Sequence, residues 1–94
     1  MPKEVYLVYL EGRLTTLQNR MHEVRRQLEH DSPANRVHGA GELAILERRM
    51  QDLRAKIARI RGENDGLYAS VMTELEEDVD SIGVVLDQLF SGVR

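Results

Sequence analysis

The feature that most constrains this chain is an unbroken heptad pattern of apolar residues in its first third. They follow one another at alternating steps of three and four: Leu7, Leu10, Leu14, Leu17, Met21, Val24 and Leu28. This spacing places them on one side of an α-helix and is typical of helices that pair with other helices. A second pattern of the same kind runs through Leu43, Leu46, Met50, Leu53, Ile57 and Ile60. Together the two patterns predict an antiparallel coiled-coil hairpin.

A third apolar pattern follows the hairpin. Its members are Leu67, Val71, Leu75, Val79, Ile82, Leu86, Leu89 and Val93. Successive steps of four between Leu67 and Val79 interrupt the heptads, which then resume. Val85 and Phe90 widen the stripe, which favours packing in a bundle. We therefore predict an all-α fold, either a three-helix bundle or a dimeric bundle built from hairpins. Residues 1–94 form a single domain in this prediction, with helices at about 3–30, 42–61 and 66–91.

The N-terminal residues 3–12 permit a second interpretation. Their β-branched and aromatic side chains would also suit a short strand. We favour a helix, because the pattern that begins at Leu7 continues to Leu28 and only Gly12 interrupts it.

The connection between the first two predicted helices is long. His30 to Pro33 ends the first helix, since the residue before a proline avoids helical dihedrals. Ser32 with Pro33 would cap a single helical turn, and Gly39 and Gly41 bracket the entry to the second helix. The predicted connection spans about 11 residues, more than is usual in helical bundles.

Residues 61–66 separate the second and third patterns, and two interpretations compete there. Asn-Asp-Gly is a turn signal, and two glycines disfavour a helix. However, Ile60, Asn64 and Leu67 keep the heptad spacing, so a continuous helix with Asn64 in its core is the alternative. We predict a break, because a helix of about 50 residues is rare outside long coiled coils.

Composition narrows the possible cellular location of the protein and the kinds of site that it can contain. The chain has no cysteine, which excludes disulfides and thiolate metal sites within it. No apolar run approaches the ~20 residues that span a bilayer, and no secretory signal is recognisable at the N-terminus. We therefore expect a cytoplasmic protein that does not enter the membrane.

No catalytic, cofactor or metal site is predicted. His22, His30 and His38 are eight residues apart, a spacing that no metal-binding motif requires. The acidic run within 74–80 lacks the loop that a calcium hand needs. No glycine pattern fits a nucleotide phosphate, and no serine has a recognisable catalytic partner. We expect no enzymatic activity.

The charge is unevenly distributed along the chain. Residues 1–61 contain 12 basic and 8 acidic residues, whereas residues 62–94 contain one basic and 8 acidic residues. The positions that flank the first two patterns hold seven bases and two acids, so the hairpin should repel itself unless an acidic segment lies along it. The acidic segment 74–80, from the same chain or from a second copy, would neutralise the hairpin.

A basic set on the second helix offers an alternative function. Its members are Arg48, Arg49, Arg54, Lys56, Arg59 and Arg61. A basic helix can follow a phosphate backbone, which would make this a small nucleic-acid-associated protein. Glu47 and Asp52 interrupt the set, and no aromatic residue is interleaved for base stacking.

Apolar residues beside the patterns predict self-association. The candidate interface residues are Val5, Tyr6, Val8, Tyr9, Val85, Leu86, Leu89 and Phe90. The first four surround the first helix on sides that one neighbouring helix cannot cover, and soluble monomers rarely expose a large apolar patch. We therefore expect a protein-interaction or scaffold module without catalytic activity. It would form a homodimer, and a helix of another protein is a further possible partner.

Overall fold

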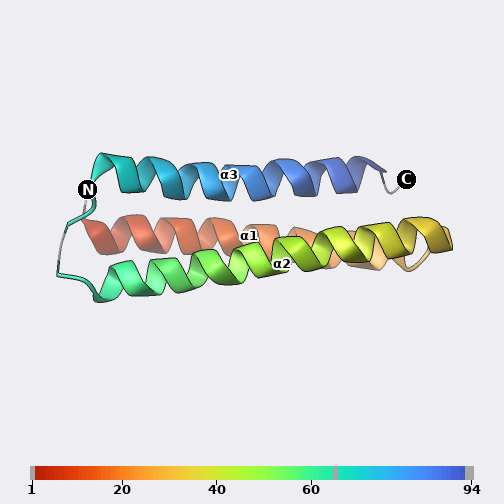
Figure 1. The fold of residues 1–94 in the computed structure, drawn as a ribbon, viewed down its shortest axis with the longest axis horizontal. Helices are drawn as coiled ribbons and strands as arrows, with labels where there is room; N and C mark the ends of the chain where they lie inside the picture. The colour runs from red at the N-terminus through yellow and green to blue at the C-terminus, as the bar shows by residue number, and fades with distance from the viewer. Residues whose placement is uncertain (1, 65, 93–94) are drawn as a thin grey trace.

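Three helices make up the described part of the chain. The computed structural model describes residues 2–64 and 66–92, with α1 at Lys3–Leu28, α2 at Pro33–Gly62 and α3 at Ala69–Gly92. The helices run up, down and up again in a rod of 49 × 18 × 18 Å (Figure 1). Over the described residues there is no strand. The predicted all-α fold is confirmed, and residues 3–12 belong to a helix.

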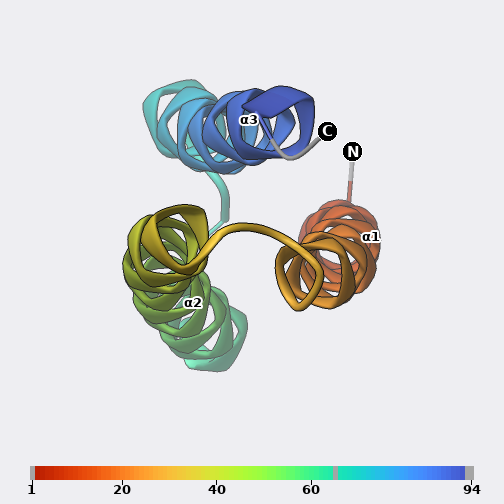
Figure 2. The same ribbon diagram turned by 90° about the vertical axis from the view of Figure 1, so that its right-hand side faces the viewer.

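The three apolar patterns meet along the axis of the rod. Viewed end-on, the helices stand at the corners of a triangle, so each contributes one side to a common core (Figure 2). Every member of the first two patterns is buried. The third pattern contributes Leu75, Val79, Ile82 and Leu86. Its first residues, Leu67 and Val71, are partly buried against this core, and Val93 lies outside the described residues.

The second helix begins nine residues before its predicted start, at Pro33 instead of residue 42. The side-chain oxygen of Ser32 accepts a hydrogen bond from the backbone N–H of Asn35 at 3.2 Å, and Pro33 occupies the first helical turn. Serine as cap followed by proline is a start signal for a full helix, not for a single turn. The predicted connection of about 11 residues is therefore wrong, and only residues 29–32 join the two helices.

Gly39 lies inside α2, although the sequence suggested that it belonged to a loop. At this position the end of α1 lies very close to α2. A Cβ at this position would lie 2.5 Å from Cδ1 and 2.7 Å from Cδ2 of Leu28. A methyl group here would force the end of the Leu28 side chain to shift, so this glycine reflects helix packing and not a chain break. Gly41, by contrast, has nothing within 4 Å of an added Cβ.

The predicted break after the second pattern is confirmed. α2 ends at Gly62, where the Glu63 N–H donates to the Ile60 carbonyl at 3.2 Å. The ammonium of Lys3 also donates to the Ile60 carbonyl at 3.0 Å, which ties the C-terminus of α2 to the N-terminus of α1. A cation at this end is favourable, because the last carbonyls of a helix carry partial negative charge. Asn64 is exposed and outside the helices, and Asp65 lies outside the described residues.

Candidate interaction surfaces

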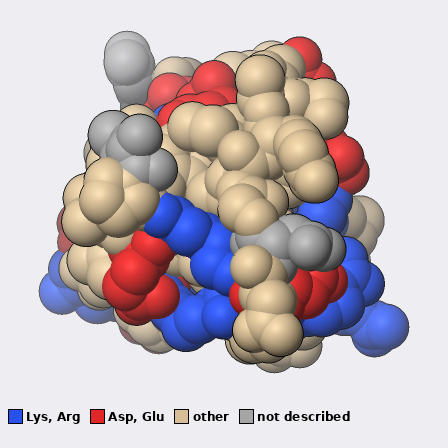
Figure 3. Space-filling view, turned by 90° about the vertical axis from the view of Figure 1, so that its left-hand side faces the viewer, with Lys and Arg blue, Asp and Glu red and all other residues tan. Residues whose placement is uncertain are grey.

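The acidic side chains of α3 neutralise the hairpin within a single chain, as one of the two predicted arrangements requires. Arg13 of α1 contacts Glu76 at 2.7 Å and Asp80 at 2.6 Å. Further pairs between the hairpin and α3 are Arg20 with Asp87 and Lys56 with Glu74. Seen from one end, basic side chains gather in the lower half, over α1 and α2, and acidic ones dominate the top, over α3 (Figure 3). Each exposed pair contributes at most about 1 kcal/mol, so together they select the position of α3 more than they stabilise it.

The two acidic flanking residues of the hairpin bridge α1 and α2. Glu11 pairs with Arg61 at 2.5 Å, and Glu47 pairs with Arg25. Arg61 also contacts Glu4 at 2.9 Å. The hydrogen bond from Arg61 lowers the pKa of Glu11 below its usual value. These pairs reduce the expected repulsion between α1 and α2 toward both ends of the hairpin, independently of α3.

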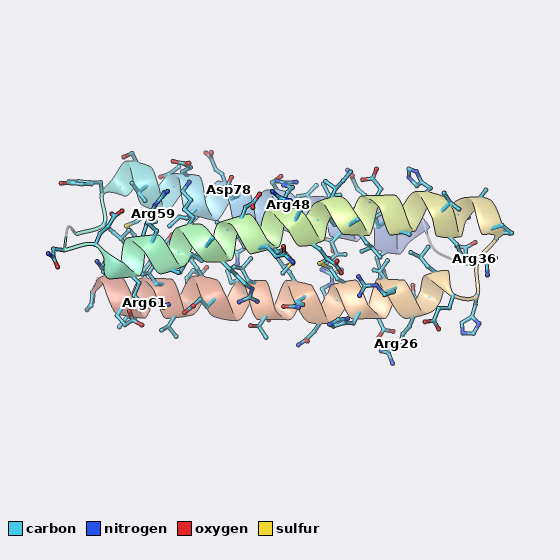
Figure 4. The ribbon with its side chains drawn as sticks, turned by 60° about the horizontal axis from the view of Figure 1, so that its bottom comes forward. Arg26, Arg36, Arg48, Arg59, Arg61 and Asp78 are labelled. Atoms are coloured by element: carbon cyan, nitrogen blue, oxygen red, sulfur yellow. The ribbon has the colours of Figure 1, made fainter. Side chains whose placement is uncertain are left out.

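The basic residues of α2 do not share one face, contrary to the basic face that the sequence suggested. Four of the six turn toward neighbouring helices: Arg49 donates to Ser81 Oγ at 2.7 Å, Arg54 donates to Gln18 Oε1 at 3.2 Å, Lys56 pairs with Glu74, and Arg61 pairs with Glu4 and Glu11. They do so because they occupy the positions that flank the apolar pattern. Arg48 and Arg59 are exposed on α2 away from α1, whereas Arg61 points toward α1 (Figure 4). Arg48 pairs with Asp52 at 3.3 Å on its own helix.

Tyr6 anchors α1 to the start of α3. It is buried, and its hydroxyl hydrogen bonds to the Met72 carbonyl at 3.2 Å and to Glu76 Oε1 at 3.0 Å. Burial, together with the neighbouring carboxylate of Glu76, raises the pKa of Tyr6 to about 12. Because the Tyr6 hydroxyl makes both of its hydrogen bonds within the chain, we assign Tyr6 to the core of the bundle and not to its surface.

The predicted interface residues separate into three groups. Tyr6 and Leu86 are buried in the bundle, so both are corrected from surface to core. Val85 and Leu89 are partly buried against it. The exposed members are Val5, Val8 and Tyr9 on α1 and Phe90 on α3. Tyr6 is buried because α3 packs against the side of α1 that carries it. Leu86 is buried because it belongs to the apolar pattern by which α3 faces the core.

The outer side of α1 carries an exposed strip without charge. We call it the α1 strip, and its residues are Val5, Val8, Tyr9, Gly12, Thr15, Thr16 and Asn19. All are exposed, in a chain whose residues are 31% charged. The exposed side of α2 carries Arg48, Asp52 and Arg59, and that of α3 carries Glu77 and Asp80. From Val5 to Asn19, the outer side of α1 therefore differs in chemistry from the exposed sides of α2 and α3.

Side chains of the α1 strip are held in place by their own helix. The Thr15 hydroxyl donates to the Glu11 carbonyl at 3.0 Å and that of Thr16 to the Gly12 carbonyl at 3.2 Å. These hydroxyls therefore do not need water as an acceptor. The Tyr9 ring packs against the Tyr6 ring, with 5.9 Å between centroids, and lies 6.0 Å from the Arg13 guanidinium. An ordered aromatic side chain is typical of binding surfaces, because little entropy is lost when it is covered.

Sequence reasoning found only Val5, Val8 and Tyr9 of this strip. It missed Gly12, Thr15, Thr16 and Asn19, because it searched for apolar residues and not for the absence of charge. Counting charges at positions opposite the apolar pattern of each helix would have found the strip.

The described part of the chain was also compared with the requirements of a metal site and of a membrane span. Among residues 2–64 and 66–92, no group of three or more His, Asp or Glu side chains is placed to hold a metal ion. His22, His30 and His38 are all exposed. Within the same residues, no helix is sufficiently long and apolar to span a membrane.

Comparisons with known proteins add no relative: no family model, no curated protein and no solved structure matches this chain. The surfaces described above are therefore the basis for a proposal about function.

Proposed function

We propose that this protein is an interaction module without catalytic activity, which self-associates through the α1 strip as a homodimer. The observation that carries the proposal is the exposed, uncharged strip along α1 of a highly charged chain. Val5 and Val8 are 57% and 55% exposed. Apolar groups on a helix whose other sides are already packed gain stability only by contact with another molecule. A cytoplasmic location belongs to the same proposal.

The nucleic-acid alternative has less support. Binding along a phosphate backbone needs several cations on one side. Four of the six basic residues on α2 already contact α1 or α3. The acidic surface of α3 would also repel the phosphates.

Mass measurement by light scattering coupled to size exclusion tests the proposal. We expect wild type at tens of micromolar to have the mass of two chains. The double variant Val5→Glu with Val8→Glu should have the mass of one chain while keeping its helical circular dichroism. The matched control is Ile45→Glu with Val84→Glu, which places the same charges at residues of equal exposure, 57% and 56%, on α2 and α3. The control should remain dimeric.

A single-chain mass for wild type would contradict self-association. A dimeric Val5→Glu, Val8→Glu variant would contradict the α1 strip as the interface. Retardation of a short duplex DNA by wild type, lost in Arg48→Ala with Arg59→Ala, would favour the nucleic-acid alternative.

A further inference from the structure

The described residues between α2 and α3 lie outside any helix, yet a helical spacing continues through them. The two helices meet at the same end of the rod, where residues 63–68 join them (Figure 1). The steps of three and four run on through Ile57, Ile60, Asn64, Leu67 and Val71. If the connection became helical, the core residues of α2 and α3 would therefore lie along one side of a single long helix.

Two glycines are the main obstacle to a helix in this connection. No proline lies between α2 and α3, whereas Gly62 and Gly66 each lower helix stability relative to alanine. Neither glycine has a positive φ, and an added Cβ at either would meet nothing within 4 Å. The bend therefore does not depend on glycine for its backbone conformation or for space. Alanine fits both positions in the bent chain and would also favour a continuous helix.

The carbonyl groups at the end of α2 find their donor on α1. The Lys3 ammonium donates to the Ile60 carbonyl at 3.0 Å and also to the Glu63 carbonyl. In a continuous helix these carbonyls would instead accept from backbone N–H groups four residues further along the chain. Both the bent and the straight form thus satisfy the carbonyls, so neither form is excluded by unpaired polar groups.

A straight helix would carry α3 away from its own hairpin, and the apolar side of α3 would then need the hairpin of a second copy. That hairpin offers every contact that α3 makes within one chain, because the copies are identical. The contacts of Arg49 with Ser81 and of Lys56 with Glu74 are both centred on the connection. Two antiparallel long helices related by a two-fold axis near Asn64 would therefore repeat these contacts between copies. Exchange of an identical element is a low-cost route to a dimer.

We propose that two copies of this chain exchange α3 by joining α2 and α3 into one continuous helix, so that each α3 packs against the hairpin of the other copy. The inference goes beyond the proposed function, because exchange uses the core side of α3 and leaves the α1 strip exposed. Asn64 comes to lie near the two-fold axis, where the amide groups of the two copies can hydrogen bond to each other and fix the register. The two glycines set the balance between the closed and the exchanged form.

Cysteine cross-linking distinguishes the two forms, because the chain has no cysteine of its own. Arg49→Cys with Ser81→Cys places one thiol on α2 and one on α3, at residues whose side chains are in contact. The full chain is unfolded in urea, refolded at several concentrations, treated with a short bismaleimide and run on a denaturing gel. A closed chain gives a product of one-chain mass, whereas an exchanged pair gives a product of two-chain mass. Each single-cysteine variant measures the background of unrelated two-chain product.

The two glycines supply the decisive comparison. The same cysteine pair is placed in Gly62→Ala with Gly66→Ala, and in Gly41→Ala as a matched control within a helix. Each alanine favours a helix by up to about fivefold, and an exchanged pair contains every substitution twice. We therefore expect Gly62→Ala with Gly66→Ala to form the two-chain product at concentrations at least about tenfold below those that the wild-type background needs. Gly41→Ala should match the wild-type background.

Two results would overturn the inference. A product of one-chain mass alone, in every background and at every concentration, overturns the exchange of α3. Equal amounts of two-chain product with and without the alanines at the connection overturn the continuous helix as its route. If the double alanine variant loses its helical circular dichroism, Gly66→Ala alone takes its place, and the same comparison decides.

The outcomes also separate this inference from the proposed function. A two-chain mass in solution with only one-chain cross-links supports pairing through the α1 strip and overturns exchange. Two-chain cross-links that persist in Val5→Glu with Val8→Glu support exchange that does not use the strip. A single-chain mass for wild type contradicts the strip as an interface, and the cross-links after refolding still decide about exchange.

Discussion

Two glycines of α2 that are two residues apart should respond oppositely to alanine. Both lie inside the helix, but their surroundings differ. At Gly39 the new methyl group would meet Leu28, with its Cδ1 at 2.5 Å, its Cδ2 at 2.7 Å and its Cγ at 3.2 Å. At Gly41 nothing lies within 4 Å. Rotation of one methyl group cannot relieve the first contact, because the whole end of Leu28 is too close.

The magnitudes follow from two opposing effects. Replacing glycine by alanine inside a helix stabilises it by up to about 1 kcal/mol. Overpacking a filled core typically costs about 1–3 kcal/mol. Gly41→Ala shows the first effect without the second, so it should stabilise the fold by about 0.5–1 kcal/mol. Gly39→Ala includes both, and it should be about 1–3 kcal/mol less stable than Gly41→Ala.

Urea unfolding followed by circular dichroism measures both variants at one fixed protein concentration, since self-association would contribute to the apparent stability. Gly41→Ala serves as the matched control, because it makes the same chemical change in the same turn of α2. If Gly39→Ala stabilises as much as Gly41→Ala, α1 does not pass close to Gly39. If Gly41→Ala has no effect, that position is not within a helix, and the start of α2 at Pro33 is refuted.

Three further predictions concern the core and the pH response. Leu53→Ala should destabilise the fold by about 2–5 kcal/mol, whereas Ile45→Ala on the exposed side of α2 should change it by less than about 0.5 kcal/mol; equal midpoints in urea would contradict the core assignment. The pKa of Glu11 is lowered in the folded chain, so the ionised Glu11 carboxylate should stabilise the fold at neutral pH. This stabilisation should be lost as the pH falls through and below 4.5. Glu11→Gln should therefore show a smaller drop in thermal midpoint between pH 7 and pH 3 than wild type. The pKa of Tyr6 is raised from 10.0 to about 12, so wild type should lose stability as the pH rises through this interval; a Tyr6→Phe variant with the same alkaline loss would refute that role.

The three helices and their core could be predicted because burial follows the heptad spacing. Every residue of the first two patterns is buried, and the turn signal at Asn64 and Gly66 outweighed the heptad spacing that continues through it. The start of α2 could not be predicted in the same way. A glycine that breaks a helix and one that admits a neighbouring side chain look identical in sequence. Only the position of Leu28 distinguishes them at Gly39.

The surfaces were harder to predict than the core, because each flanking residue has two possible neighbours. The sequence indicated that seven basic flanking residues need acidic partners. Within the chain, α3 supplies acidic partners for three of them, Arg13, Arg20 and Lys56. It could not indicate that Glu11 and Glu47 already join α1 to α2, since this depends on the alignment of two antiparallel helices.

A similar ambiguity divided the apolar residues at the start of α1. Tyr6 and Val5 are adjacent in sequence, but α3 covers Tyr6 and leaves Val5 exposed. Once α2 and α3 have covered two sides of α1, only the side opposite its apolar pattern remains for another molecule. On that side the exposed positions from Val5 to Asn19 hold no charged residue, so the uncharged stretch extends well beyond the few apolar residues. A solvated helix face would gain solubility from charges at these positions, so their absence along the whole strip is better explained by contact with a second helix than by exposure to water.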